Sequence, residues 1–237
     1  MFKIRHYYKK YKYLSSKKVK NCLFVIKLFV KRFFCNYKKL VGFTFLEIKD
    51  LCFKPVWKSF HNYKNLIVEI GSGHGELADF LSDNLENFVV SFEISKPFAK
   101  RVSNVLQSRK KENAVVIYGD AYHLIKLLFN RNSINKVYIL FPDPWHKKKH
   151  HKRRPLTKAF FKIVDTLLVK DGKLIFVSDY PEYFDFVFKE FYFSKCKCDY
   201  LISLFDPERF KLPKTHYYKK WKKHGKTHFY YLELQKS

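Results

Sequence analysis

Between residues 65 and 180 the sequence alternates short apolar runs with longer amphipathic segments, and this alternation constrains the fold more than any other feature. The apolar runs are almost uninterrupted, as in strands that are buried on both faces. The pattern therefore predicts an α/β fold with a doubly wound, mostly parallel sheet. Strands are predicted at 66–70, 88–92, 114–118, 137–141 and 173–177, and helices at 76–84, 97–109, 121–130 and 156–168.

Beyond Pro181 a further helix leads to two candidate strands, 198–204 and 227–234, which would bring the sheet to seven strands. A basic segment with Pro207 and Pro213 separates them. Residues 65–237 are therefore predicted to form one domain.

Residues 1–64 have a different character, with 17 Lys or Arg against two acids, Glu47 and Asp50. We predict a basic N-terminal arm that is partly helical, with an amphipathic helix over 17–34. That helix would either cover the edge of the core or contact RNA.

The charge of the whole chain points to a polyanionic partner. With 48 Lys or Arg and 21 Asp or Glu, the net charge is +27, and a field of this sign attracts RNA, DNA or acidic membranes. No stretch is long and apolar enough to span a bilayer. Five unevenly spaced cysteines favour a reducing cytoplasm, and Cys196 and Cys198 lack zinc spacing, so we expect structural thiols and no metal.

Glycines are concentrated directly after the first predicted strand. The segment Gly71-Ser-Gly73-His-Gly75-Glu76 holds three of the seven glycines in the chain. Glycines there let the backbone turn sharply and approach a ligand, and the next helix offers its positive end. A dinucleotide fingerprint would require Gly or Ala where Glu76 stands, and this carboxylate would repel a pyrophosphate.

Acidic residues mark the ends of the first three predicted strands: Glu69, Glu93 and Asp120. The carboxyl ends of parallel strands meet at one edge of a sheet, which favours a shared binding site. Glu93 and Asp120 could each instead be a turn residue or a helix cap.

The fourth predicted strand runs into Phe141-Pro-Asp143-Pro-Trp145, followed by nine residues, 146–154, with six Lys or Arg, three His and no acid. Each proline favours an extended residue before it, so Asp143 is expected on a rigid turn at the strand end. Trp145 offers a stacking face, and the cations through Arg154 suit phosphates. Together they indicate chemistry on a nucleic-acid base, although a solvated basic loop after an edge strand is the alternative.

The glycine segment, preceded by an acid, resembles the first motif of class I S-adenosylmethionine-dependent methyltransferases. This implies a Rossmann-like domain with S-adenosylmethionine as cofactor. The stretch 141–154 resembles the signature of bacterial tRNA (guanine-N7-)-methyltransferases, which modify a guanine in the tRNA variable loop. The likeness covers roughly residues 66–234 and leaves out the basic arm.

The resemblance also implies roles for individual residues. Asp143 takes the catalytic position of that family, and Thr215 begins a segment similar to Thr-x-(Phe/Tyr)-Glu, in which Tyr218 replaces the Glu. Lys147 and Asp179 match positions that contact tRNA, and Asp179 could equally cap a helix before Pro181. The implied cofactor-binding residues are Glu69, Gly71, Gly73, Glu93 at the ribose, Asp120 at the adenine, and Asp143.

The predicted function is methyl transfer from S-adenosylmethionine to the ring nitrogen at position 7 of a tRNA guanine, by a cytoplasmic monomer or homodimer that needs no membrane. Two alternatives remain. One is a methyltransferase of the same fold acting on another RNA base or a protein amino group, and the other is a non-catalytic tRNA-binding subunit. The cations after Trp145 favour RNA, and the intact acids and glycines favour an enzyme.

Overall fold

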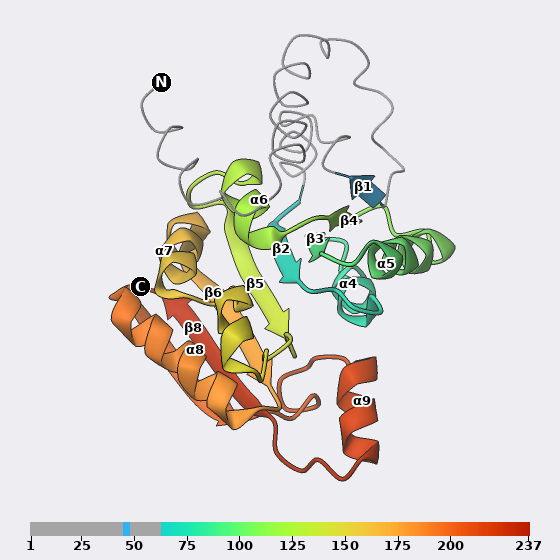
Figure 1. The fold of residues 1–237 in the computed structure, drawn as a ribbon. Coiled ribbons are helices and arrows are strands. Elements are labelled where there is room, and N and C mark those ends of the chain that lie inside the picture. Colours follow the sequence, from blue (N-terminus) through green and yellow to red (C-terminus); the bar gives the residue numbers. More distant parts are fainter. Residues whose placement is uncertain (1–44, 48–62) are drawn as a thin grey trace, which may run out of the picture. The chain divides into compact units, whose positions relative to one another are not determined.

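The predicted alternation of strands and helices is confirmed in the computed structural model of the chain, which describes residues 45–47 and 63–237 (Figure 1). The predicted helix at 17–34 and most of the basic arm lie outside the described residues. The first part of the domain contains β2 (Asn65–Ile70), α4 (Glu76–Leu81), β3 (Asn87–Glu93), α5 (Lys96–Ser108), β4 (Ala114–Tyr118), α6 (Ala121–Leu128) and β5 (Ile134–Leu140). The second part contains the 3-10 helix η4 (Lys148–Arg153), α7 (Lys158–Leu167), β6 (Leu168–Ser178), α8 (Pro181–Ser194), β7 (Cys198–Leu204), α9 (His216–Lys223) and β8 (Tyr230–Lys236).

The described strands form one sheet in the order β1-β4-β3-β2-β5-β6-β8-β7. Strands β2 to β6 pair in parallel, and β8 lies antiparallel between β6 and β7. The seven predicted strands are therefore present in a mostly parallel sheet. An eighth, β1 (Phe45–Glu47), comes from the stretch assigned to the basic arm and pairs with the edge of β4.

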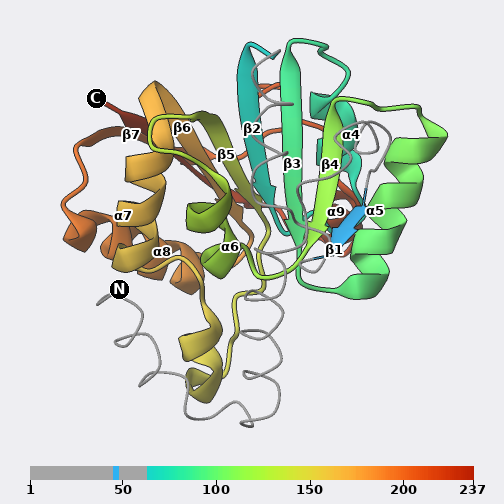
Figure 2. The ribbon, with the colours of Figure 1, turned by 90° about the horizontal axis from the view of Figure 1, so that it is seen from above.

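Two layers of helices cover the sheet, as Figure 2 shows: α4 and α5 lie on one side, and α6, α7 and α8 on the other. Alternate residues of each strand face opposite layers, which explains why the strands are almost wholly apolar. On the side of α4 and α5, Ile67, Val89 and Val116 pack against Leu77 and Val102.

The strand boundaries differ from the prediction where pairing extends beyond the apolar run. β6 begins at Leu168, not at residue 173, because Leu168 pairs with Ile134 at the far end of β5 before a register shift. β8 begins at Tyr230, three residues later than predicted. The carbonyl of Phe229, just before it, accepts from the Phe205 N–H and so closes the segment between β7 and β8. That segment also contains α9, which was not predicted.

Two further observations bear on the partners of the chain. No helix in the described ranges has the length and apolar character needed to cross a membrane. Cys196, just before β7, and Cys198, its first residue, are partly buried free thiols. The described residues contain no group of three or more His, Cys, Asp or Glu that could hold a metal ion.

Candidate active site

The glycine segment forms a tight turn between β2 and α4. Gly71 and Gly73 have φ angles of +83° and +50°, in the left-handed region that favours glycine. The Gly71 N–H donates to the carbonyl of Phe92 at 2.8 Å, which ties the turn to the end of β3. A Cβ added at either glycine would meet no atom within 4 Å, so both face open space. Gly75 differs, because its Cβ would lie 3.3 Å from Val102 Cγ1.

Glu69 and Glu93 lie beside this turn, on the ends of adjacent strands. Glu69 is buried and accepts a hydrogen bond from the Ser91 hydroxyl at 2.6 Å. Burial, opposed by the hydrogen bond from Ser91 and aided by the nearby carboxylates of Glu93 and Glu76, raises the pKa of Glu69 to about 7. Glu93 accepts from the Gly73 N–H at 3.0 Å and from the Ser95 N–H at 2.8 Å, so it holds the turn in place.

Asp120 follows β4 and caps α6. Its Oδ1 accepts from the Tyr122 N–H at 2.9 Å, and its Oδ2 lies 3.6 Å from His123 Nε2. The helix-cap interpretation is therefore confirmed, while the implied contact with an adenine stays a prediction. Because Gly119 N–H donates to the carbonyl of Glu93 at 2.9 Å, Asp120 nevertheless lies at the same edge of the sheet as Glu93.

The proline turn after β5 has a different backbone from the one predicted. Phe141, which precedes Pro142, has a φ of +51° and is left-handed rather than extended. This conformation is held by its N–H, which donates to the carbonyl of Val177 at 2.8 Å, and by the burial of its ring against Phe229. Asp143 is exposed, and its Oδ1 accepts from the Trp145 N–H at 2.9 Å.

The basic stretch after the turn contains two different kinds of cation. Lys147, like its neighbours at 148 and 149, is exposed, and Arg153 covers the ring of Trp145 at 4.7 Å. Arg154, in contrast, is buried, with 6% of its surface exposed. Its Nε donates to the carbonyl of Pro144 at 2.9 Å, and its guanidinium lies 4.8 Å from the centre of the Tyr183 ring. The expectation that the phosphate-binding arm extends through Arg154 is therefore wrong.

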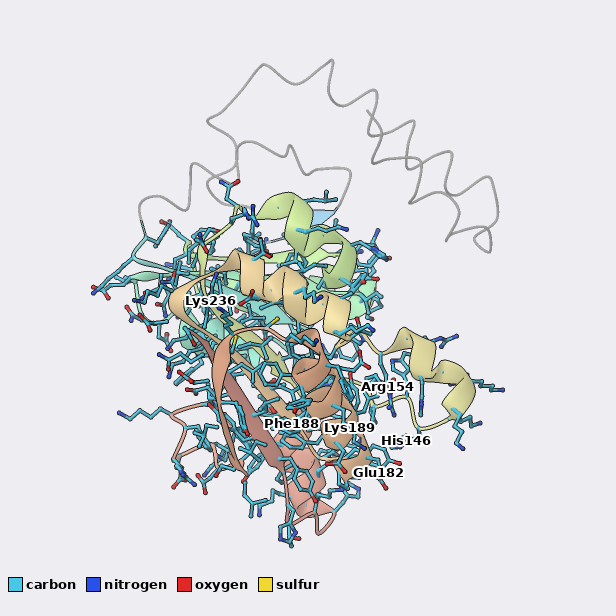
Figure 3. The ribbon with its side chains drawn as sticks, turned by 90° about the vertical axis from the view of Figure 1, so that its left-hand side faces the viewer. His146, Arg154, Glu182, Phe188, Lys189 and Lys236 are labelled. Atoms are coloured by element: carbon cyan, nitrogen blue, oxygen red, sulfur yellow. The ribbon has the colours of Figure 1, made fainter. Side chains whose placement is uncertain are left out.

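Figure 3 shows Arg154 where the basic stretch meets α8, with His146 nearby. The His146 ring lies edge-on to that of Tyr180 at 4.4 Å. The sequence gives no sign that Arg154 differs from Arg153, because the aromatic residues that bury it lie in α8.

The remaining predicted residues lie near the end of β6 and at the start of α9. Asp179 is buried after β6, but Tyr180 takes the N-cap position of α8, so the cap interpretation of Asp179 is wrong. Thr215 is the N-cap of α9, and its Oγ1 accepts from the Tyr218 N–H at 3.3 Å. The Tyr218 ring packs 4.9 Å from that of Phe229, where the family of the resemblance has a Glu.

Tyr217, which was not singled out from the sequence, is also part of the site. Its ring stacks on Phe141 at 5.2 Å with an interplanar angle of 25°. Burial and the carboxylates of Asp179 and Asp143 raise the pKa of the Tyr217 hydroxyl. The tyrosine therefore lies within electrostatic range of both acids.

Strand pairing brings the two turns to the same edge of the sheet. β2 and β5 are neighbours, and Glu69 pairs with Tyr138. The glycine turn begins two residues after Glu69, and Asp143 follows Tyr138 by five residues. This register supports the convergence of the glycine turn and the Asp143 turn that is expected for the carboxyl ends of parallel strands.

The charges around the glycine turn suit a cationic ligand. Three carboxylates, those of Glu69, Glu76 and Glu93, lie close enough to affect one another in a chain of net charge +27. Ser72 Oγ is buried and has no hydrogen-bond partner within the described part of the chain. A ligand with positive charge and polar groups would satisfy both features, whereas a pyrophosphate would be repelled.

The sheet order, with helices on both faces and the glycine turn at the carboxyl ends of the parallel strands, defines a Rossmann-like fold of the methyltransferase class. A solved structure described as an antibiotic-related methyltransferase superposes with a TM-score of 0.57 and 18% sequence identity, over 78% of this chain and 94% of that one. The family model described as "Putative methyltransferase" matches residues 63–231, and the chain belongs to this family.

Curated relatives add a more specific name. A tRNA (guanine-N(7)-)-methyltransferase of Buchnera aphidicola is 33% identical over 156 residues, which cover 65% of this chain and 64% of the relative. The protein of that name from Thermotoga maritima is 33% identical over 176 residues, 73% of this chain and 55% of the relative. The match thus spans less than two thirds of the length of either relative.

Proposed function

We propose that the chain is a tRNA (guanine-N7-)-methyltransferase. The observation that carries this proposal is the placement of Asp143, exposed on its turn, at the same sheet edge as the glycine turn and beside the exposed lysines at 147–149. The names of the curated relatives support the same reaction. The domain over 65–237 carries the activity, and we place it in the cytoplasm as a monomer or homodimer.

S-adenosylmethionine fits the glycine turn, because its sulfonium and ammonium groups are cations and the turn is lined by carboxylates. Gly71 and Gly73 would allow close approach of the backbone, and Glu69, Glu93 and Asp120 would hold its polar groups. When bound, it supplies an electrophilic methyl group. The free hydroxyl of Ser72 offers a further hydrogen bond.

The target nitrogen of guanine carries a lone pair and no proton, so the chain needs to position the base but not to remove a proton. With the methyl donor bound, the lone pair would form the new bond to the methyl carbon as the bond from carbon to sulfur breaks, which would leave the base cationic. The Asp143 carboxylate would hold the base edge and stabilise this developing positive charge. Lys147 and its neighbours would bind phosphates, and Asp179 and Thr215 would border the substrate.

The test is methylation of unmodified tRNA with S-adenosylmethionine, followed by strand cleavage at 7-methylguanine. The wild-type chain should produce one cleavage site in the variable loop. Methyl incorporation without cleavage would instead indicate another base, and incorporation into protein would support an amino-group methyltransferase.

Asp143→Asn separates catalysis from binding. The amide oxygen of Asn can still accept from the Trp145 N–H, so the turn should persist, but the charge is lost. We expect turnover to fall about 100-fold with cofactor affinity largely kept. Asp199→Asn, the same change at an exposed position of β7, is the matched control and should keep full activity. An unchanged rate for Asp143→Asn would remove Asp143 from the reaction.

A further inference from the structure

The segment between β7 and β8, residues 205–229, forms a strap that contains α9. Its two ends are joined, because the Phe205 N–H donates to the carbonyl of Phe229 at 2.7 Å. Three apolar residues of the strap are buried in the hydrophobic core: Phe205, Leu212 and Phe229. Figure 1 shows α9 beyond the carboxyl ends of the parallel strands, on the side of α4.

The far side of the strap contacts the glycine turn through His216. The ring of His216 stacks on that of His74, in the turn, with centroids 4.2 Å apart and an interplanar angle of 16°. The His216 N–H donates to Glu76 Oε1 at 2.9 Å. We call His74, Glu76 and His216 the latch.

The latch supplies a hydrogen-bond acceptor for the start of α9. The first N–H groups of a helix have no partner within the helix, and they favour a negative charge nearby. Thr215 satisfies one of them from within the strap. Glu76, from the first turn of α4, satisfies another from outside it, so the start of α9 is completed only when the strap lies against the glycine turn.

We propose that the latch positions the strap, and thereby Tyr217, relative to the glycine turn, and that it releases when His74 is protonated. Tyr217 follows His216 directly and stacks on Phe141, beside the turn that carries Asp143. The latch therefore connects the two halves of the site. Calling these halves the cofactor and substrate sides depends on the proposed function.

The hydrogen bond from Arg101 explains the dependence on protonation. Arg101 Nη1 lies 2.9 Å from Nδ1 of His74. A guanidinium can only donate, so Nδ1 must be unprotonated to accept this bond. A protonated His74 would lose the bond and would place its charge beside Arg101.

The other groups that face His74 give the same sign. Burial and the neighbouring His216 and Arg101 lower the pKa of His74 from 6.5, while the carboxylate of Glu76 opposes them. Release of the strap would remove His216 from His74 and expose the His74 ring, so the pKa of His74 would rise towards its usual value. The contribution of neutral His74 to the latch is therefore fully present above about pH 6.5 and decreases as the pH falls below it.

Hydrogen exchange of the full chain, without tRNA or cofactor, tests the release. After correction for intrinsic rates, amides of α9 should exchange about 2- to 10-fold faster at about pH 5.5 than at about pH 8, the effect of one lost aromatic contact. Amides of α7 serve as the internal control and should not respond. Equal acceleration in α7, or no acceleration in α9, would overturn the proposal.

A double variant removes the titration and keeps the stacked rings. In His74→Phe/His216→Phe, α9 should exchange at the same corrected rate at both pH values. If this variant accelerated in acid as the wild type does, the histidines would not be responsible. Neither result depends on catalysis, so failure to methylate tRNA would refute the proposed function and leave the latch standing.

A third measurement addresses the connection between the two halves. With S-adenosylhomocysteine added at about pH 8, exchange in α9 should slow about 2- to 10-fold in the wild type. His216→Ala, which lacks the stacked ring, should bind the compound but show no slowing. Equal slowing in both proteins would show that the latch does not transmit occupancy of the glycine turn.

Discussion

Arg153 and Arg154 are adjacent in the basic stretch, yet Arg153 is exposed and Arg154 is buried. Substituting each in turn tests whether Arg154 stabilises the proline turn and does not bind phosphate. Arg154→Ala removes the donor to the Pro144 carbonyl and the guanidinium between Tyr183 and Phe186. A buried carbonyl left unpaired costs about 1–3 kcal/mol, and a desolvated cation–π contact contributes up to about 2 kcal/mol. We expect a loss of about 3 kcal/mol in the free energy of unfolding.

Arg153→Ala is the matched control. Arg153 is exposed and only covers the Trp145 ring, so its removal should cost no more than about 1 kcal/mol. Urea unfolding followed by circular dichroism would distinguish the two, since a loss of 3 kcal/mol lowers the midpoint by about 1 M for a domain of this size.

Binding should show the opposite order. Arg153→Ala should weaken tRNA binding and reduce its salt slope by about one, as expected for a lost phosphate contact. Arg154→Ala should leave the salt slope unchanged under conditions in which the variant is folded. If Arg154→Ala unfolded like the wild type and altered the salt slope instead, the assignment of Arg154 to the turn would be refuted.

Three further predictions follow from the glycine turn and the basic stretch. Burial raises the pKa of Glu69 to about 7, so its protonated form contributes stability that is present below pH 4.5 and lost as the pH rises towards 7. Glu69→Gln cannot ionise, so the difference between its melting temperature and that of the wild type should shift in favour of the variant over that range. Gly75→Ala should destabilise more than Gly71→Ala in urea, because only the former also meets Val102. Neutralising the lysines at 147–149 should reduce the salt slope of tRNA binding by about three, and an unchanged slope would exclude them from the interface.

The sheet could be predicted because its strands are buried on both faces, which leaves an uninterrupted apolar signature in β2 to β5. The prediction was less accurate where another element decides the boundary. The start of β6 is separated from its apolar run by Lys170, Asp171 and Gly172, and its pairing depends on Ile134 at the beginning of β5. α9 was missed for another reason: its three core-facing aromatic residues, Tyr217, Tyr218 and Trp221, are only partly buried and stand among four lysines, so its sequence reads as a basic segment.

The site was predictable where backbone geometry leaves a mark on the sequence. Gly71 and Gly73 are such marks, since their positive φ angles favour glycine. Phe141 is a counterexample, because its left-handed conformation is imposed by β6 and by packing against distant aromatic rings. Tyr217 likewise gains its place by stacking on Phe141, which is distant in the sequence.

The position of β8 has a consequence for synthesis of the protein. β7 leaves the ribosome before β8, yet β8 is its partner in the sheet and separates it from β6. Until the strap and β8 have followed, the nascent chain carries β7 as a lone strand. Tyr200, Leu201 and Ile202 are 59%, 44% and 45% exposed even after folding, so this unpaired strand is a place where nascent chains could associate with one another.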